Sequence, residues 1–237
     1  MPLSLIKINH KLSLQQTGQH APGPVCVDFL SGKSTYRHHH GGGKNQLIAK
    51  AVGITSKIKP FVLDATAGLG QDAFVLATLG CNVLMLERSK IICALLEDGL
   101  NRAKNETWFR ALSLKLVCAD AINYLKTISS APDVIYLDPM FPEKTNSALP
   151  KKEMRLLREV AGDDIDSEKL FFEAVRVAKK RIVVKRARLA PTISAQKPDL
   201  VFTGKSGRFD IYFPSKINRA AFSAALVTDQ GSPCLNY

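Results

Sequence analysis

The stretch Val62-Leu-Asp-Ala-Thr-Ala-Gly-Leu-Gly70 decides the fold of this chain. Its apolar first half is typical of a buried strand, its two glycines of a tight turn, and residues 71–79 of the helix that follows. Gly68 and Gly70 let the backbone approach a bound cofactor closely. A strand, a glycine turn and a helix in this order form the nucleotide-binding corner of a doubly wound α/β sheet. The spacing Gly-x-Gly-x-x-Ala also satisfies the loose dinucleotide fingerprint, so nicotinamide and S-adenosylmethionine are both candidate cofactors.

Strands and helices alternate along the rest of the chain, which predicts a mostly parallel, doubly wound sheet with helices on both faces. The expected strands are residues 25–30, 61–66, 82–87, 114–119, 133–138 and 181–186, with a closing hairpin over 200–213. The expected helices are residues 45–52, with Asn45 as N-cap, and 71–79, 90–104, 151–161 and 167–179. Residues 1–59 read as an N-terminal extension of short strands, a basic loop and a helix, residues 60–219 as the Rossmann-like domain, and residues 220–237 as a flexible tail.

Carboxylates follow four successive strands of the predicted sheet, at Asp64, Glu87, Asp120 and Asp138. Ligands of an open parallel sheet bind outside the carboxyl ends of its strands, so we expect these groups to meet at one site. Asp64 is placed to meet the amino group of the cofactor, Glu87 its ribose hydroxyls and Asp120 its adenine amine. Asp120 reads equally well as the N-cap of the helix that follows it. Together the four carboxylates favour S-adenosylmethionine.

The sequence Asp138-Pro-Met-Phe-Pro142 follows the fourth of these strands and predicts a pocket for a flat ring that bears an amine. Asp138 and the carbonyl of Pro139 would accept the amine hydrogens and localise the nitrogen lone pair, while Phe141 would stack on the ring. Proton loss can follow methyl transfer, so Asp138 need not act as a strong base. A dehydrogenase has no use for such a pocket, and we therefore favour a methyltransferase.

Charge points to a polyanionic partner, because the 237 residues carry a formal net charge of +12. A base inside a duplex cannot enter such a pocket unless it is flipped out, which is easier in a hairpin loop, so loop RNA is the expected target. The Gly/His-rich loop, the residues after the acceptor motif and the end of the fifth strand supply the candidate RNA contacts. They are Lys33, Arg37, Lys44, Lys144, Lys151, Lys152, Arg155, Lys185 and Arg186. The cations of residues 151–158 also have the spacing of a solvated helix face.

Several other classes of protein are disfavoured by the sequence. The five cysteines lack the paired spacing of zinc sites and read as free thiols of a reducing compartment. The adjacent residues His38-His-His40 point to opposite sides of an extended loop, so we expect no metal site. No apolar run reaches the length of a membrane span and no signal peptide is recognisable, so we expect a cytoplasmic protein without a membrane partner.

Seven motifs, in order over about residues 25–213, resemble the ribosomal RNA small subunit methyltransferase J family (RsmJ). They are Asp64-Ala-Thr-Ala-Gly-Leu-Gly70, Asp72-Ala-Phe-Val-Leu-Ala77, Met85-Leu-Glu-Arg88, Tyr136-Leu-Asp-Pro-Met-Phe-Pro142, Lys151-Lys-Glu-Met-Arg155, Val183-Val-Lys-Arg186 and Arg208-Phe-Asp-Ile-Tyr212. The resemblance implies a class I S-adenosylmethionine-dependent methyltransferase fold and methylation of the exocyclic N2 of a guanosine in the 3′-terminal hairpin region of 16S rRNA. It also implies cofactor contacts by Gln71, Asp72, Glu87, Arg88, Asp120, Ala121 and Asp138.

Two alternatives stay open at this point. One is an N-methyltransferase for another amine, either adenine N6 of nucleic acid or a protein side chain, since the acceptor motif resembles the pocket that these enzymes share. The other is a catalytically inactive RNA-binding protein. Whether the substrate is naked 16S rRNA or the small ribosomal subunit, and whether the chain oligomerises, is not decided by the sequence.

Overall fold

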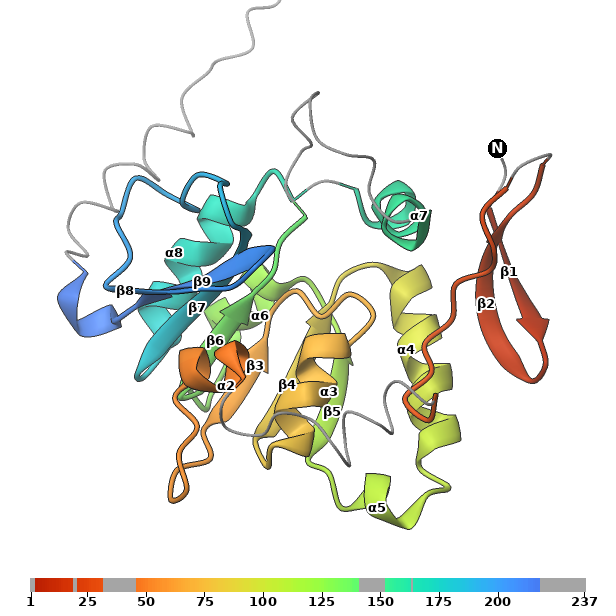
Figure 1. The fold of residues 1–237 in the computed structure, drawn as a ribbon, viewed down its shortest axis with the longest axis horizontal. Coiled ribbons are helices and arrows are strands. Elements are labelled where there is room, and N and C mark those ends of the chain that lie inside the picture. The colour runs from red at the N-terminus through yellow and green to blue at the C-terminus, as the bar shows by residue number, and fades with distance from the viewer. Residues whose placement is uncertain (1–2, 19–20, 32–45, 141–151, 163, 218–237) are drawn as a thin grey trace, which may run out of the picture.

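The protein is built on a seven-stranded sheet with the strand order β5-β4-β3-β6-β7-β9-β8, shown in Figure 1. The computed structural model describes residues 3–18, 21–31, 46–140, 152–162 and 164–217. The strands are β1 (Leu3–Ile8), β2 (Lys11–Gln16), β3 (Phe61–Asp64), β4 (Asn82–Glu87), β5 (Leu114–Cys118), β6 (Val134–Leu137), β7 (Arg181–Ala187), β8 (Leu200–Thr203) and β9 (Gly207–Tyr212). The helices are α2 (Leu47–Val52), α3 (Gln71–Thr78), α4 (Lys90–Ala103), α5 (Thr107–Arg110), α6 (Ala121–Thr127), α7 (Lys152–Ala161) and α8 (Ser167–Val177), with a 3-10 turn, η2 (Pro214–Lys216).

The order of the parallel strands places a ligand site between β3 and β6. From β3 the chain adds β4 and then β5 on one side, and it crosses back to add β6 and β7 on the other side. The closing pair, β8 and β9, is antiparallel. Two neighbouring strands whose connections run in opposite directions leave a crevice at their carboxyl ends, where open α/β sheets bind their ligands. The predicted mostly parallel, Rossmann-like sheet is confirmed.

Both faces of the sheet are buried, which explains the continuous apolar strands. Alternate residues of β3 enter different cores: Val62 packs with α3 and α4, whereas Leu63 packs with α6 and α8. Phe29, from the segment that precedes α2, packs on Phe74 of α3, with ring centroids 5.3 Å apart. The N-terminal segment therefore shares the core of the sheet.

Most expected elements agree with the observed ones within one or two residues, but one expected strand and one expected N-cap residue do not. Residues 25–30 do not form a strand, because only Val25 makes a β-bridge, to Leu14. The N-cap position of α2 is held by Gln46 without a side-chain hydrogen bond, so the prediction of Asn45 as N-cap is wrong; Asn45 itself lies outside the described residues. The short helix α5 was not predicted.

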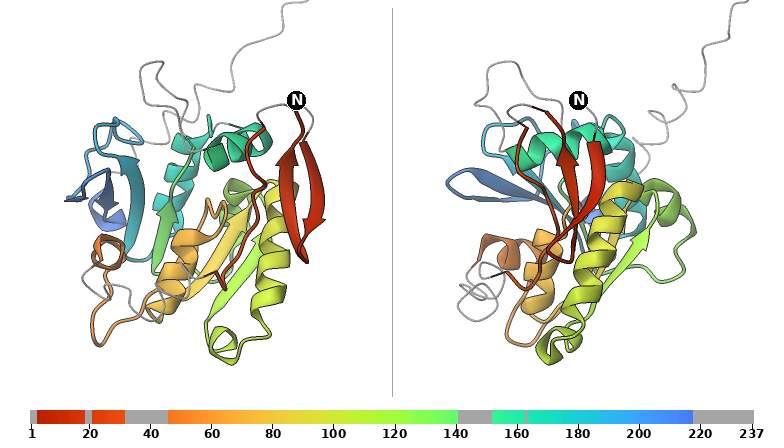
Figure 2. Two further views of the ribbon diagram at one scale, coloured as in Figure 1. Left: turned by 45° about the vertical axis from the view of Figure 1, so that its right-hand side comes forward. Right: turned by 90° about the vertical axis from the view of Figure 1, so that its right-hand side faces the viewer.

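The N-terminal hairpin of β1 and β2 lies beside α4 and outside the main sheet, as Figures 1 and 2 show. Asn9 and His10 form its tight turn with positive φ angles of 48° and 63°, as two-residue hairpin turns require. The Leu12 N–H donates to the Asp98 carboxylate of α4 over 3.1 Å. In the described part of the chain, no helix has both the length and the apolar character needed to cross a bilayer.

Candidate functional site

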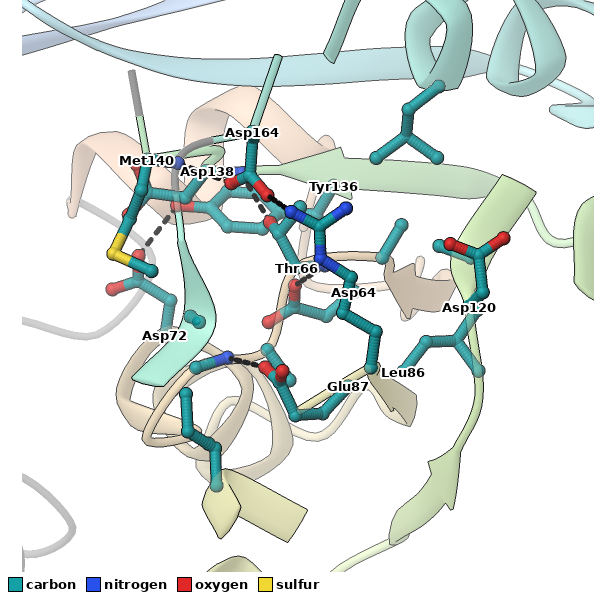
Figure 3. A pocket seen from close by; sticks show the side chains of 18 of the residues that line it. Asp64, Thr66, Asp72, Leu86, Glu87, Asp120, Tyr136, Asp138, Met140 and Asp164 are labelled. Carbon is teal, nitrogen blue, oxygen red and sulfur yellow. Dashed lines mark hydrogen bonds and ion pairs between the residues drawn. The ribbon is translucent and has the colours of Figure 1, made fainter. Parts of the chain in front are cut away.

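A pocket of about 260 Å³ lies at the carboxyl ends of the parallel strands, over the crevice between β3 and β6 (Figure 3). The four predicted strand-end carboxylates, Asp64, Glu87, Asp120 and Asp138, all line it. The lining contains seven acidic side chains and only two basic ones, Arg88 and Lys185. This negative wall suits a ligand with cationic and hydrogen-donating groups, and it disfavours the pyrophosphate of a dinucleotide.

The glycine turn forms one wall of the pocket. Gly68 has φ +52°, its N–H donates to the Glu87 carboxylate over 2.9 Å, and a Cβ at this position would point into open space. Gly70 has φ +71°, but a Cβ there would meet Leu96 at 2.9 Å and Met85 at 3.2 Å. Gly70 is not among the pocket-lining residues, so the prediction that both glycines approach the cofactor applies structurally to Gly68. Gly70 permits the turn and its packing.

Asp64 and Glu87 are buried carboxylates without a cationic partner in the described structure. Asp64 is 2% exposed and accepts the Thr66 N–H over 3.1 Å. Burial raises the pKa of Asp64 well above its usual range, and the neighbouring carboxylates of Asp72 and Asp138 add to the rise. Burial also raises the pKa of Glu87, whose carboxylate accepts backbone N–H groups from Ser89 and Gly68. Buried carboxyl groups of this kind fit the ammonium group and ribose hydroxyls of S-adenosylmethionine, and the open side of the glycine turn leaves room for its chain.

Asp120 is the predicted N-cap of α6, and it lies in the pocket where its predicted contact with adenine would be made. Its carboxylate caps α6 by accepting the Asn123 N–H over 2.9 Å, and the residue also lines the pocket. Gln71, Asp72, Arg88 and Ala121, which only the family resemblance implied as cofactor contacts, line the pocket as well.

The acceptor end of the pocket is organised by Lys185, which bridges two carboxylates. Its ammonium lies 2.8 Å from Asp72 Oδ2 and 2.8 Å from Asp138 Oδ2. Tyr136 donates its hydroxyl to Asp72 over 2.6 Å, and the Asp138 N–H donates to the Thr66 hydroxyl over 2.6 Å. Burial lowers the pKa of Lys185, but the two carboxylates outweigh it and raise the pKa overall, so the side chain stays an ammonium. Desolvation raises the pKa of Asp138, and Lys185 opposes that rise.

Asp164 and Asp166, which the sequence analysis did not identify, join the cofactor side to the acceptor motif. Asp164, between α7 and α8, accepts the Met140 N–H over 2.5 Å, and its own N–H donates to the Met140 carbonyl over 2.9 Å. The same carboxylate lies 2.5 Å from the guanidinium of Arg88, which also pairs with Asp166 at 3.0 Å. Arg88 is 76 positions from Asp164 and 78 from Asp166 along the chain, so no local pattern could have paired them.

The predicted RNA contacts differ in their placement. Lys185 lies in the pocket and not on its rim. The prediction that Arg186 contacts RNA is wrong. Arg186 is 5% exposed and its Nε donates to the Pro191 carbonyl over 2.9 Å, so the side chain is buried beneath the surface that RNA can reach. Pro139 is buried between Asp138 and Met140. The backbone of α7 includes Lys152 and Arg155. The predicted residues Lys33, Arg37, Lys44, Phe141, Lys144 and Lys151 lie outside the described residues.

Cysteines and candidate metal ligands contribute nothing further to the site. Cys26, Cys81, Cys93 and Cys118 are free thiols. Within the ranges that the structure describes, no three His, Cys, Asp or Glu side chains are grouped so that they could hold a metal ion. Residues 38–40, with their three histidines, are outside those ranges.

The chain is similar to known proteins over most of its length. A family model described as "Putative SAM-dependent methyltransferase" matches residues 1–214. Ribosomal RNA small subunit methyltransferase J from Coxiella burnetii is 52% identical over 201 residues, which cover 85% of this chain and 79% of that protein. The protein of the same name from Ectopseudomonas mendocina is 50% identical over 212 residues, which cover 88% of this chain and 82% of that one. The crystal structure of a SAM-dependent methyltransferase from Neisseria gonorrhoeae has a TM-score of 0.69 and 37% identity, covering 89% of this chain and 82% of that chain.

Proposed function

Because the chain belongs to the ribosomal RNA small subunit methyltransferase J family of S-adenosylmethionine-dependent methyltransferases, we propose that it methylates the exocyclic N2 of a specific guanosine near the 3′ end of 16S rRNA. One observation carries the proposal: the acidic pocket joins the glycine turn after β3 to Asp138 after β6. A cofactor wall and an acceptor wall therefore face the same cavity. Because the proposed substrate is ribosomal RNA, the proposed location of the protein is the cytoplasm.

The residues of the cofactor wall have distinct parts in this proposal. Asp64 would accept hydrogen bonds from the amino group of the cofactor, and Glu87 from its ribose hydroxyls. Gly68 leaves the space that a side chain would take. When bound, S-adenosylmethionine supplies a methyl group on a sulfonium, which is already a strong electrophile. The protein therefore has to hold the acceptor nitrogen close and aligned.

The residues of the acceptor wall prepare a poor nucleophile. An exocyclic amine shares its lone pair with the purine ring, and hydrogen-bond acceptors on the amine hydrogens localise that lone pair. Asp138 is held by Thr66 through its N–H and by Lys185 through its carboxylate, so one acceptor has a fixed position. The Pro139 carbonyl is the second proposed acceptor. Desolvation raises the pKa of Asp138, and the adjacent Lys185 ammonium opposes that rise, so it favours the ionised form that accepts an amine hydrogen.

The charge of the pocket explains how RNA would enter it. Seven acidic side chains repel phosphate, whereas a neutral guanine base carries amine and N1 hydrogens that carboxylates accept. The target base must therefore leave its stack and enter alone, while cations outside the pocket hold the backbone.

Mass spectrometry of 16S rRNA from cells that lack the protein tests the proposal directly. One methyl group on guanine N2 should disappear and return when the gene is restored. Methylation in vitro of naked 16S rRNA, isolated small subunits and DNA, followed by mapping of the modified atom, distinguishes guanine N2 from adenine N6. Asp138→Ala should abolish transfer and leave RNA affinity within about twofold, because the side chain lies inside the pocket. A methyl group on any other atom would refute the assignment.

A further inference from the structure

Leu189 is the most exposed large hydrophobic side chain among the described residues, at 94%. It lies in the turn that follows β7, between Arg188 and Ala190. Single exposed leucines are common on protein surfaces and need no explanation by themselves. Three properties distinguish Leu189 from such residues: the position of its turn, the hydrogen bonds that fix the turn, and the charges beside it.

The turn lies on the edge of the sheet where the pocket opens. β7 runs parallel to β6, with Val184 beside Leu137, so the next residues, Lys185 and Asp138, meet at the carboxyl ends of the two strands. Leu189 follows Lys185 by four positions, which is at most about 13 Å of chain at 3.3 Å per residue. The β8–β9 turn ends at Gly207, which pairs with Ala187, so it lies on the same edge (Figure 1).

Hydrogen bonds from the Arg208 side chain fix the backbone of the turn. The Arg208 guanidinium donates to three carbonyl groups of the turn, those of Ala187 at 3.2 Å, Arg188 at 2.8 Å and Ala190 at 2.7 Å. The same guanidinium is fixed by the fully buried carboxylate of Asp210, at 2.7 Å. Leu189 is therefore presented on a fixed support, and its exposure is not the result of a loose loop.

Basic side chains flank Leu189. Arg188 is exposed and its N–H donates to the Ser206 carbonyl over 3.3 Å, which brings the exposed Lys205 of the β8–β9 turn beside it. Within the described part of the chain, neither cation has an ion-pair partner. The other highly exposed aliphatic side chain, Ile165 at 88%, is instead flanked by Asp164 and Asp166. Of the two most exposed aliphatic side chains in the described part of the chain, Leu189 is the one accompanied by the positive charges that phosphates require.

We propose that Leu189 is a wedge that enters the RNA base stack beside the target nucleotide and occupies the space that the flipped base leaves. This inference rests on the proposed rRNA substrate. Apolar side chains inserted between bases offset part of the cost of unstacking, and flanking cations hold the adjoining phosphates. In this protein, Arg188 and Lys205 are the flanking cations that would hold the phosphates. The acidic pocket receives the base, and the Leu189 turn keeps the stack closed behind it.

Methylation of two RNA probes tests the wedge. One is the 3′-terminal hairpin of 16S rRNA, and the other is a short unpaired RNA with the same nucleotides around the target. Leu189→Ser should lower kcat/KM on the hairpin by about 10- to 100-fold and on the unpaired RNA by less than about threefold, because only the hairpin has a stack to open. Leu189→Met, which keeps an apolar tip, should restore most of the activity. The matched control is Ile58→Ser, at a 51% exposed isoleucine on the opposite edge, before β3.

Each other outcome has a defined meaning. Equal losses on both RNAs would make Leu189 a general contact and overturn the wedge, as would unchanged activity on the hairpin. A loss seen only with isolated small subunits, and not with the free hairpin, would assign the turn to a ribosomal protein and also overturn it. If the wild-type protein methylates neither RNA nor isolated subunits, the proposed function fails first, and the wedge fails with it.

Discussion

Replacing Lys185 by methionine should move the acid limb of the pH–rate profile to higher pH. The ammonium lies 2.8 Å from Asp138 Oδ2, and both side chains are more than a third exposed, at 38% and 39%. Two unit charges at that distance attract by about 1.5 kcal/mol at the dielectric constant of water, and we take this screened value because of the exposure. About 1.4 kcal/mol corresponds to one pKa unit, so loss of Lys185 should raise the pKa of Asp138 by about one unit.

The sign of the shift follows from which form of Asp138 is active. Only the carboxylate accepts the amine hydrogens, so activity is lost as pH falls through its pKa, and a higher pKa moves this loss to higher pH. The assay is kcat/KM for the RNA between pH 5 and 9, with saturating S-adenosylmethionine. Lys185→Arg keeps the positive charge and should keep the limb close to its wild-type position. An acid limb that is unchanged in Lys185→Met would refute the reasoning, because it would mean that the reaction rate does not depend on the ionisation of Asp138.

Three further predictions concern the cofactor wall and the Leu189 turn. Asp64→Asn should raise the melting temperature of the cofactor-free protein at neutral pH, by about 2–4 °C for each kcal/mol relieved, because burial raises the pKa of Asp64 and the fold therefore loses stability as pH rises above the unfolded-state pKa of this carboxyl. The same change should weaken binding of S-adenosylhomocysteine, measured by calorimetry. Gly70→Ala should cost about 2 kcal/mol in urea unfolding, because its φ is positive and its Cβ would meet packed side chains. Gly68→Ala, whose Cβ would meet no atom, should cost only about 1 kcal/mol from its positive φ, and should in addition weaken binding of S-adenosylhomocysteine by about tenfold or more. Arg208→Ala should cost about 3–5 kcal/mol, since it leaves the fully buried Asp210 carboxylate unpaired; a loss below about 1 kcal/mol would contradict the importance of this pair.

The sequence was sufficient for the parts of the fold that depend on local periodicity. Asn82–Glu87 was predicted to the residue, and the ends of α3 and α4 were predicted within one residue, because apolar strands and amphipathic helices are local patterns. Residues 25–30 are apolar in the same way but have no partner strand along their length. Val25, Val27 and Phe29 are buried in the core formed with α3 and α4 instead, which periodicity alone does not distinguish from a strand.

The candidate site was predictable where it depends on strand ends, and less so where it depends on side-chain direction. Asp64, Glu87 and Asp138 converge because the carboxyl ends of parallel strands meet at one edge. Lys185 and Arg186 were expected to lie together on the rim, but successive strand residues point to opposite faces. Lys185 therefore enters the pocket, and Arg186 is buried on the other side of the sheet.

Positive charge outside the pocket and negative charge inside it are both consistent with the proposed reaction. The chain has a formal net charge of +12, yet the pocket lining holds seven acidic side chains against two basic ones, so the positive surplus outside the pocket is larger than the total. A protein that bound only the phosphate backbone of RNA would gain nothing from a negative cavity next to its RNA-binding surface. An enzyme that must hold phosphates outside and admit a single uncharged base benefits from both. The same separation explains why the apolar tip at Leu189 is accompanied by cations, whereas Ile165 beside the cofactor wall is accompanied by acids.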